Sequence, residues 1–199
     1  MRRRMAIMIL VAVVGAACSA VSSNPITLEY TAPDFLNPAQ GAEGVTVRVV
    51  VYDARADRSS LGTLQDSGGA AIGPITTTSD LTGTIAQATA SSLATRGFNV
   101  TATGPVVVRI DLVRFDNQFV ATTFGESASA RMVINVQVIE AGGKQIYAKT
   151  YSAQGRNANF QSASSDNAKP ALDRALSDAV NALVTDPDFI AALDRAARA

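Results

Sequence analysis

The sequence has 199 residues, enough for one domain of ordinary size, and 47% of them are hydrophobic. Its 17 basic and 17 acidic residues balance. Loss of the three arginines at residues 2–4 would leave 14 basic against 17 acidic side chains, a net charge of −3. This charge gives no reason to expect nucleic acid as a partner. The chain has no His and one Cys, which excludes hydrolases with a His base, Cys/His zinc sites and an internal disulfide.

Residues 1–17 have the layout of a secretory signal peptide. Three arginines are followed by an apolar run over residues 5–14 and then by small residues. The run is much shorter than the roughly 20 residues of a membrane-spanning helix. We therefore expect a leader that is cleaved, not a permanent transmembrane anchor.

The only cysteine, Cys18, stands directly after this leader. The segment Gly15-Ala16-Ala17-Cys18 resembles a bacterial lipobox, in which the thiol receives a diacylglycerol and the cysteine becomes the first residue of the mature chain. We predict lipidation of Cys18, because a lone cysteine here is otherwise unexplained. The alternative is ordinary cleavage after Ala17 or Ala20, which would give a soluble periplasmic protein. Ser19 resembles the residue found in lipoproteins sorted to the outer membrane.

Residues 18–43 contain Ser, Pro and Gly with little periodicity, which is typical of a linker, although residues 26–30 could add a short edge strand. We therefore divide the chain into a signal peptide (1–17), a lipid-tethered linker (18–43) and a single domain (44–199).

Valines alternate along residues 45–52, as in a strand with one face in the core. Residues 53–78 are rich in Gly, Ser and Thr and could hold a small hairpin of residues 61–65 and 71–77. A helix is expected over residues 80–96, because Ser79 or Asp80 can cap its start and Gly97 suits its end.

Three strands are expected next, over residues 106–112, 128–138 and 144–153. A three-residue turn at 141–143 would pair Glu140 with Lys144 and Val138 with Ile146. A two-residue turn would instead place Val138 opposite Tyr147 and Val136 opposite Lys149. We favour the first register because it buries cleaner pairs.

Two helices end the chain. The first carries an apolar stripe from Leu172 to Val184 and can be capped by Asp166, and the second restarts at Asp186-Pro187. The order of strand, helix, three antiparallel strands and two helices predicts an α+β two-layer sandwich, with a mostly antiparallel sheet packed against two or three helices.

No catalytic, metal or cofactor site stands out, so we expect a non-enzymatic protein without cofactors. Asp53, Arg55, Asp57 and Arg58 cluster after the first strand. They suggest either a polar recognition site or, as we favour, an exposed turn with weak surface ion pairs.

The sheet face away from the helices could form a protein-binding surface. Alternatively, the N-terminal strand or residues 53–78 could cover it. Its expected apolar residues are Val107, Val113, Phe115, Val133, Ile139, Tyr147 and Tyr151, mixed with Arg109, Arg131 and Lys149. As candidate partner-binding residues we take Asp53, Arg55, Phe115, Tyr147 and Tyr151.

The order of short motifs resembles the YajG family of uncharacterised bacterial lipoproteins over nearly the whole chain. The motifs are the leader ending at Cys18, Ile26-Thr27-Leu28, the strand and turn at 47–55, Asp80-Leu81, Thr95-Arg96-Gly97-Phe98, Gly104-Pro105-Val106 and the terminal stretch 176–193. The resemblance implies an outer-membrane lipoprotein of unknown molecular role.

We therefore predict a lipid-anchored protein on the periplasmic face of the outer membrane that binds or scaffolds another envelope component. A small-molecule or glycan carrier is one alternative and would need a pocket between sheet and helices. A hydrolase that uses carboxylates alone is the other.

Overall fold

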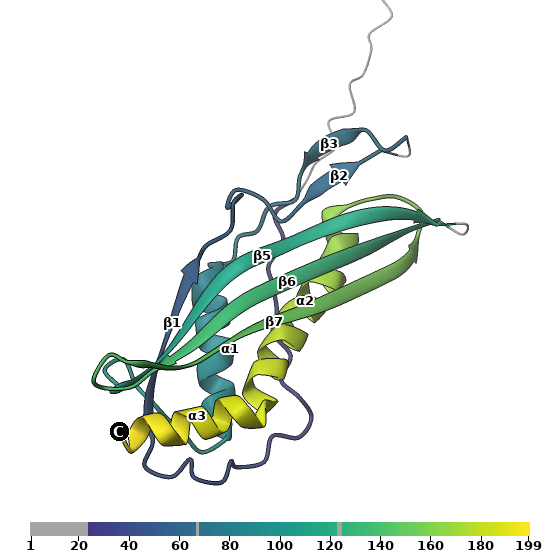
Figure 1. Cartoon of the computed structure of the whole chain (residues 1–199). Coiled ribbons are helices and arrows are strands. Elements are labelled where there is room, and N and C mark those ends of the chain that lie inside the picture. The colour runs from purple at the N-terminus through teal and green to yellow at the C-terminus, as the bar shows by residue number, and fades with distance from the viewer. Residues whose placement is uncertain (1–23, 67, 123–124) are drawn as a thin grey trace, which may run out of the picture.

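The computed structural model describes residues 24–66, 68–122 and 125–199. Its centre is a twisted sheet with strands in the order β4-β1-β5-β6-β7, and helices α1, α2 and α3 lie on one side of it (Figure 1). The expected α+β class is confirmed. Among the described helices, none has the length and apolarity needed to cross a bilayer.

The sheet is mixed, and the expectation of a mainly antiparallel sheet was wrong. β1 (Thr46–Asp53) pairs in parallel with both β4 (Asn99–Val100) and β5 (Val106–Thr122). The reason is that α1 (Leu81–Thr95) carries the chain back between β1 and β5, and such a crossover joins parallel strands. β5, β6 (Gly125–Ile139) and β7 (Gln145–Phe160) then pair antiparallel.

The helix α1 begins and ends where the capping residues in the sequence predicted. The Asp80 side chain accepts a hydrogen bond from the Thr82 amide at its start. Gly97 follows its end with φ +94°, a left-handed conformation that favours glycine, and Phe98 is buried behind it. These contacts fix where β4 begins.

The turn between β6 and β7 combines the two registers considered from sequence. The Glu140 amide donates to the Lys144 carbonyl at 3.1 Å, so the three-residue turn is correct. The register then shifts between Val138 and Ile139, and Val138 lies opposite Tyr147. The expected pairing of Val138 with Ile146 was therefore wrong, and a bulge next to the turn restores the pairing that we had rejected.

The C-terminal helices are α2 (Ser165–Thr185) and α3 (Pro187–Ala197). Ser164, not Asp166, caps α2: its side chain accepts from the Asn167 amide. Asp186 caps α3 as expected, accepting from the Asp188 amide at 2.9 Å. The apolar stripe of α2 is fully buried against the sheet.

Residues 24–31, which we expected within the linker, pack on the domain. Ile26 and Leu28 are 4% and 6% exposed. Ile26 forms a parallel bridge with Thr77, and the Tyr30 hydroxyl lies 2.7 Å from the Ser92 Oγ on α1 and donates to Asn181 on α2, also at 2.7 Å. This segment therefore lies on the helix side of the sheet.

Residues 61–75 hold the expected hairpin, β2 (Thr63–Gln65) and β3 (Ala71–Pro74), as a separate two-stranded sheet. Gly62 pairs with Asn117 next to it, so the hairpin continues the edge of β5 beyond the end of β1. Within the described residues, neither this segment nor the N-terminal one covers the sheet face away from the helices. That face is called the open face below.

Candidate functional site

The open face contains a hollow of about 720 Å³ close to the start of β5. Val50, Val107 and Ile139 provide apolar side chains from three neighbouring strands. Arg48 and Glu140 add charge at its margin. The hollow is thus an open surface of mixed apolar and ionic character, formed by three strands and the loops beside them.

Tyr52 and Arg109 form an ordered pair in this hollow. The Arg109 guanidinium carbon lies 4.9 Å from the centroid of the Tyr52 ring, which is 51% exposed. The Arg109 Nε also donates to the Asp111 Oδ1 at 3.0 Å. A cation over an aromatic face is attracted by the ring, and tyrosine and arginine are enriched where proteins bind one another. The pair therefore presents a fixed aromatic and cationic group to solvent.

The loop before β5 reaches the hollow because residue 104 is a glycine. A Cβ on Gly104 would lie 2.5 Å from the Val47 carbonyl carbon. No other residue could approach β1 this closely without a shift of the backbone. The close approach places Pro105 at the hollow.

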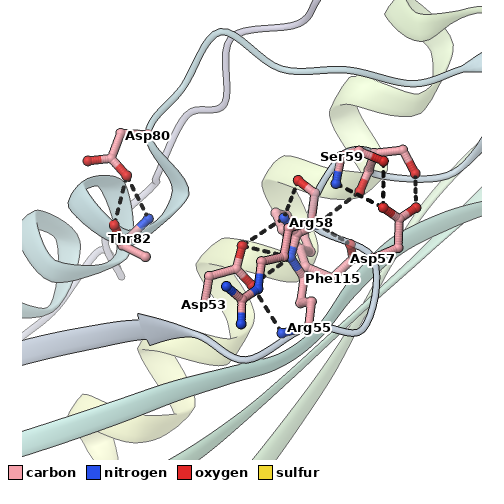
Figure 2. Close-up of polar contacts among 9 residues, drawn as sticks. Asp53, Arg55, Asp57, Arg58, Ser59, Asp80, Thr82 and Phe115 are labelled. Carbon is pink, nitrogen blue, oxygen red and sulfur yellow. Dashed lines mark hydrogen bonds and ion pairs between the residues drawn. The ribbon is translucent and has the colours of Figure 1, made fainter.

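The polar cluster after β1 is a buried structural contact (Figure 2). Arg55 is 6% exposed, and its Nε and Nη2 donate to the Asp53 carboxylate at 3.0 and 2.9 Å. Its remaining donors reach the carbonyl oxygens of Ser60, Arg58 and Phe115. All five guanidinium hydrogens are therefore used, and none is left for a ligand. The pair holds residues 54–60 against β5.

Asp53 stays ionised in this contact. Partial burial opposes the charged form, but hydrogen bonds from Arg55 outweigh it and hold the pKa of Asp53 below its usual value. The expected exposed turn was wrong for Arg55, which is buried and has no free donor, whereas Asp57 and Arg58 are exposed. Asp57 is exposed and bonds to Ser59 and Ser60, which lowers its pKa to about 2.

A smaller pocket of about 270 Å³ lies between this loop and the start of α1. Asp53 and Asp80 line it, and Figure 2 shows Asp80 turned toward Thr82 of its own helix. Hydrogen bonds from Thr82 and from the helix amides lower the pKa of Asp80. A raised pKa suits a carboxyl group to general acid catalysis, whereas the pKa of both of these aspartates is lowered.

Tyr147 and Tyr151 lie on the helix side of the sheet, not on the open face where we expected them. The hydroxyls of Tyr147 and Tyr151 donate to the Asp186 Oδ2 at 3.1 and 2.6 Å, and the Lys149 Nζ lies 2.7 Å from the same oxygen. The bulge beside Ile139 is the cause, because it reverses the faces of β7. From the sequence we predicted that Asp186 begins α3, but not that its carboxylate accepts hydrogen bonds from three side chains of β7.

Phe115 is also displaced from its expected face. It is 2% exposed, because a second bulge between Leu112 and Arg114 turns it toward the helices opposite Met132. Of the expected open-face residues, the structure does place Val107, Ile139 and Arg109 together at the hollow, and Tyr52 and Arg48 join them unpredicted.

A family model described as uncharacterized lipoprotein matches residues 34–194 of the chain. The chain belongs to this lipoprotein family. The resemblance to the YajG-like lipoproteins is thereby confirmed. The matched range begins after Cys18, which lies outside the described residues, so the predicted lipidation of Cys18 stays a prediction.

Solved structures similar to this lipoprotein come from several bacteria. A Xanthomonas campestris protein of the DUF330 family has a TM-score of 0.62 at 12% identity, covering 88% of this chain and all of that one. A lipoprotein from Neisseria meningitidis has a TM-score of 0.40 at 11% identity, over 58% and 87% of the two chains. A minor lipoprotein from Acinetobacter baumannii has a TM-score of 0.38 at 9% identity, over 76% and 91%. None of the curated proteins matches the chain.

Proposed function

We propose that this lipoprotein is a non-enzymatic protein, held by a lipid on Cys18 at the periplasmic face of the outer membrane, that binds another envelope protein through its open face. The observation that carries the proposal is the hollow of about 720 Å³ around Tyr52 and Arg109. An uncovered sheet face with fixed aromatic and cationic groups is suited to a protein partner.

A protein partner fits this surface better than a small ligand does. Small-molecule pockets usually bury most of the ligand, whereas this hollow lies on the outer face of the sheet. A carrier pocket between sheet and helices also meets an obstacle, because α2 approaches β7 so closely that a Cβ on Gly155 would lie 1.9 Å from the Ala171 carbonyl oxygen. The carrier alternative therefore has less support.

The anchor is supported by the order of signals at the N-terminus and by the family. A charged, apolar leader of 17 residues precedes the only cysteine, and the chain belongs to a lipoprotein family. Two or more acyl chains are needed to hold a protein stably on a bilayer. Ser19 favours sorting to the outer membrane over retention at the inner one.

The absence of enzymatic activity is proposed from the two polar sites. Arg55 has no free donor, and the pKa values of Asp53 and Asp80 are lowered, so these groups are suited to holding the fold. A broad substrate screen of the purified protein that found turnover would contradict this part of the proposal.

Photocrosslinking in intact cells tests the binding surface. A photoreactive phenylalanine analogue at Tyr52 should form a crosslink to one defined envelope protein, and Arg48→Glu in the same chain should weaken it. Gln87, exposed on α1, is the matched control position and should give no such product.

Two results would overturn the binding proposal. One is a folded, membrane-bound protein that gives no crosslink from Tyr52, and the other is the same product from Gln87. A crosslink from Tyr52 to a lipid or glycan would instead favour the carrier alternative.

A further inference from the structure

The N-terminal segment is fixed to the domain by backbone as well as side-chain contacts. The Ile26 amide donates to the Thr76 carbonyl at 2.9 Å, and the Thr78 amide donates to the Ile26 carbonyl at 3.0 Å. Further along, the amides of Glu29 and Thr31 donate to Asp173 and Ser177 of α2, both at 2.9 Å. With Ile26 and Leu28 buried, these contacts make residues 26–31 part of the folded domain.

The covalent length before this segment limits how far the domain can stand from its anchor. Only residues 19–23 separate Cys18 from Asn24, the first described residue. An extended chain spans at most ~3.6 Å per residue, so the six steps from Cys18 to Asn24 reach roughly 20 Å. This distance is shorter than the domain itself, because the 17 residues of β5 alone span more than roughly 50 Å at ~3.3 Å per residue.

The register of the bridges shows which end of the domain carries Asn24. The segments bridged at Ile26 and Thr77 run parallel, so the residues before Ile26 extend toward Ile75 and the β2–β3 hairpin. The segments bridged at Gly62 and Asn117 also run parallel, which places the hairpin beside the last residues of β5. The N-terminus, the hairpin and the end of β5 therefore lie at one end of the sheet, called the hairpin end, and Figure 1 shows the hairpin there, far from α3.

The hairpin end has a weakly charged, partly apolar surface that is suited to contact with a membrane. Ile72 is 38% and Val120 is 49% exposed, two of the few large apolar side chains exposed in the described chain. Between Thr63 and Pro74 the only charged residue is Asp66, residues 118–122 carry no charge, and Glu126, opposite Ala121, adds one further carboxylate. The end therefore carries few charged groups that must lose water when it approaches lipid headgroups. It has no basic cluster to attract anionic lipid.

We propose that the hairpin end rests on the leaflet that holds the lipid of Cys18, with Ile72 and Val120 nearest the headgroups. This rests on the lipid anchor of the proposed function. The hollow lies at the other end of β5: Val107 is 13 residues before Val120, or roughly 40 Å along the strand. The short tether thus points the hollow into the periplasm, toward a partner that is not in the same leaflet.

Fluorescence quenching on vesicles tests this orientation. Because a lipidated Cys18 has no free thiol, Ile72→Cys, Val120→Cys and Ala141→Cys can each carry a single fluorophore on the full lipidated chain. Ala141, exposed beside the hollow, is the matched control. On phosphatidylethanolamine–phosphatidylglycerol vesicles with brominated lipid, the labels at 72 and 120 should be quenched several-fold more than the label at 141. A long Gly/Ser insertion between Ser23 and Asn24 should remove most of that difference.

The outcomes separate the orientation from the anchor. If the protein floats with the vesicles and all three labels are quenched alike or not at all, the orientation is wrong while the anchor stands. If quenching is stronger at 141, the domain is inverted and the orientation is likewise wrong. If the protein does not float with the vesicles, the lipid anchor itself fails, and the orientation fails with it.

Discussion

The Tyr151 hydroxyl donates to the Asp186 carboxylate at 2.6 Å and so joins the edge strand β7 to the residue that begins α3. Tyr147 reaches the same oxygen and packs on Phe189 of α3, with ring centroids 6.0 Å apart. Asp186 also accepts from the Asp188 amide. One buried carboxylate thus caps α3 and joins it to β7, from which α3 is separated in the sequence by α2.

Replacing this carboxylate should destabilise the domain strongly. Asp186→Ala removes a helix cap and takes the shared acceptor from the buried Tyr151 hydroxyl and the half-buried Tyr147 hydroxyl, at a cost of about 2–4 kcal/mol. Tyr151→Phe removes one hydroxyl, with its contacts to Asp186 and to the Tyr147 hydroxyl, but keeps the helix cap, so it should cost less, about 1–2 kcal/mol. Denaturant unfolding of the two variants measures both values. Equal midpoints for Asp186→Ala and the unmodified chain would show that Asp186 does not join α3 to β7.

The same carboxylate predicts a dependence of stability on pH. Burial of Asp186 disfavours its charged form, but hydrogen bonds from Lys149 and Tyr151 outweigh that effect and hold its pKa well below the usual value. Because the folded pKa is lower than the unfolded one, the stabilisation is present above about pH 4 and is lost as the pH falls further. The difference in unfolding free energy between the unmodified chain and Asp186→Asn should therefore shrink below pH 4. A constant difference from pH 7 to pH 3 would contradict this prediction.

The buried pair after β1 predicts a second stability effect. Arg55→Ala would leave the Asp53 carboxylate and three carbonyl oxygens without their donor, and breaking a buried ion pair from one side costs about 3–5 kcal/mol. Arg55→Lys keeps the charge but cannot make the paired contacts, so an intermediate loss is expected. Faster proteolysis within residues 54–60 should accompany the loss. Full stability of Arg55→Ala would mean that the cluster is a surface turn after all.

The elements that sequence reasoning predicted well are those with local signals. Asp80 and Gly97 mark the ends of α1, and Asp186 marks the start of α3, because capping depends on a few neighbouring residues. The parallel pairing of β1 with β5 has no such signal, since the two strands are brought side by side only when α1, which connects them in the sequence, packs on the sheet.

The face predicted for three of the candidate binding residues was wrong for a different physical reason. Side chains alternate along a strand, so a single extra residue moves every later side chain to the other face. Bulges at Leu112/Arg114 and Val138/Ile139 did this to Phe115, Tyr147 and Tyr151. Val107 and Arg109 lie before the bulge in β5, and Ile139 pairs with Val107 there. The face predicted for these three residues was therefore right.

The contact between β7 and α2 gives a prediction about a single methyl group. Gly155→Ala would place a Cβ 1.9 Å from the Ala171 carbonyl oxygen, so α2 must move away from the sheet. Overpacking of this kind typically costs about 1–3 kcal/mol. Gly73→Ala is the control, because a Cβ there has no atom within 4 Å. Thermal unfolding of both variants should show a loss only for Gly155→Ala, and equal losses would mean that α2 is not held this closely.

The predicted anchor depends on one sulfur atom. Cys18→Ser removes the only thiol to which a lipid could be attached, so the protein should move from the membrane fraction to the soluble fraction or remain as an uncleaved precursor. Ser19→Asp is the informative companion, because it keeps the thiol and should shift the protein from the outer to the inner membrane. Intact mass of the mature chain should show cleavage before Cys18 and the added acyl groups. A mature chain that begins after Ala20, with no added mass, would rule out the lipid anchor and leave the open face on a freely diffusing periplasmic protein.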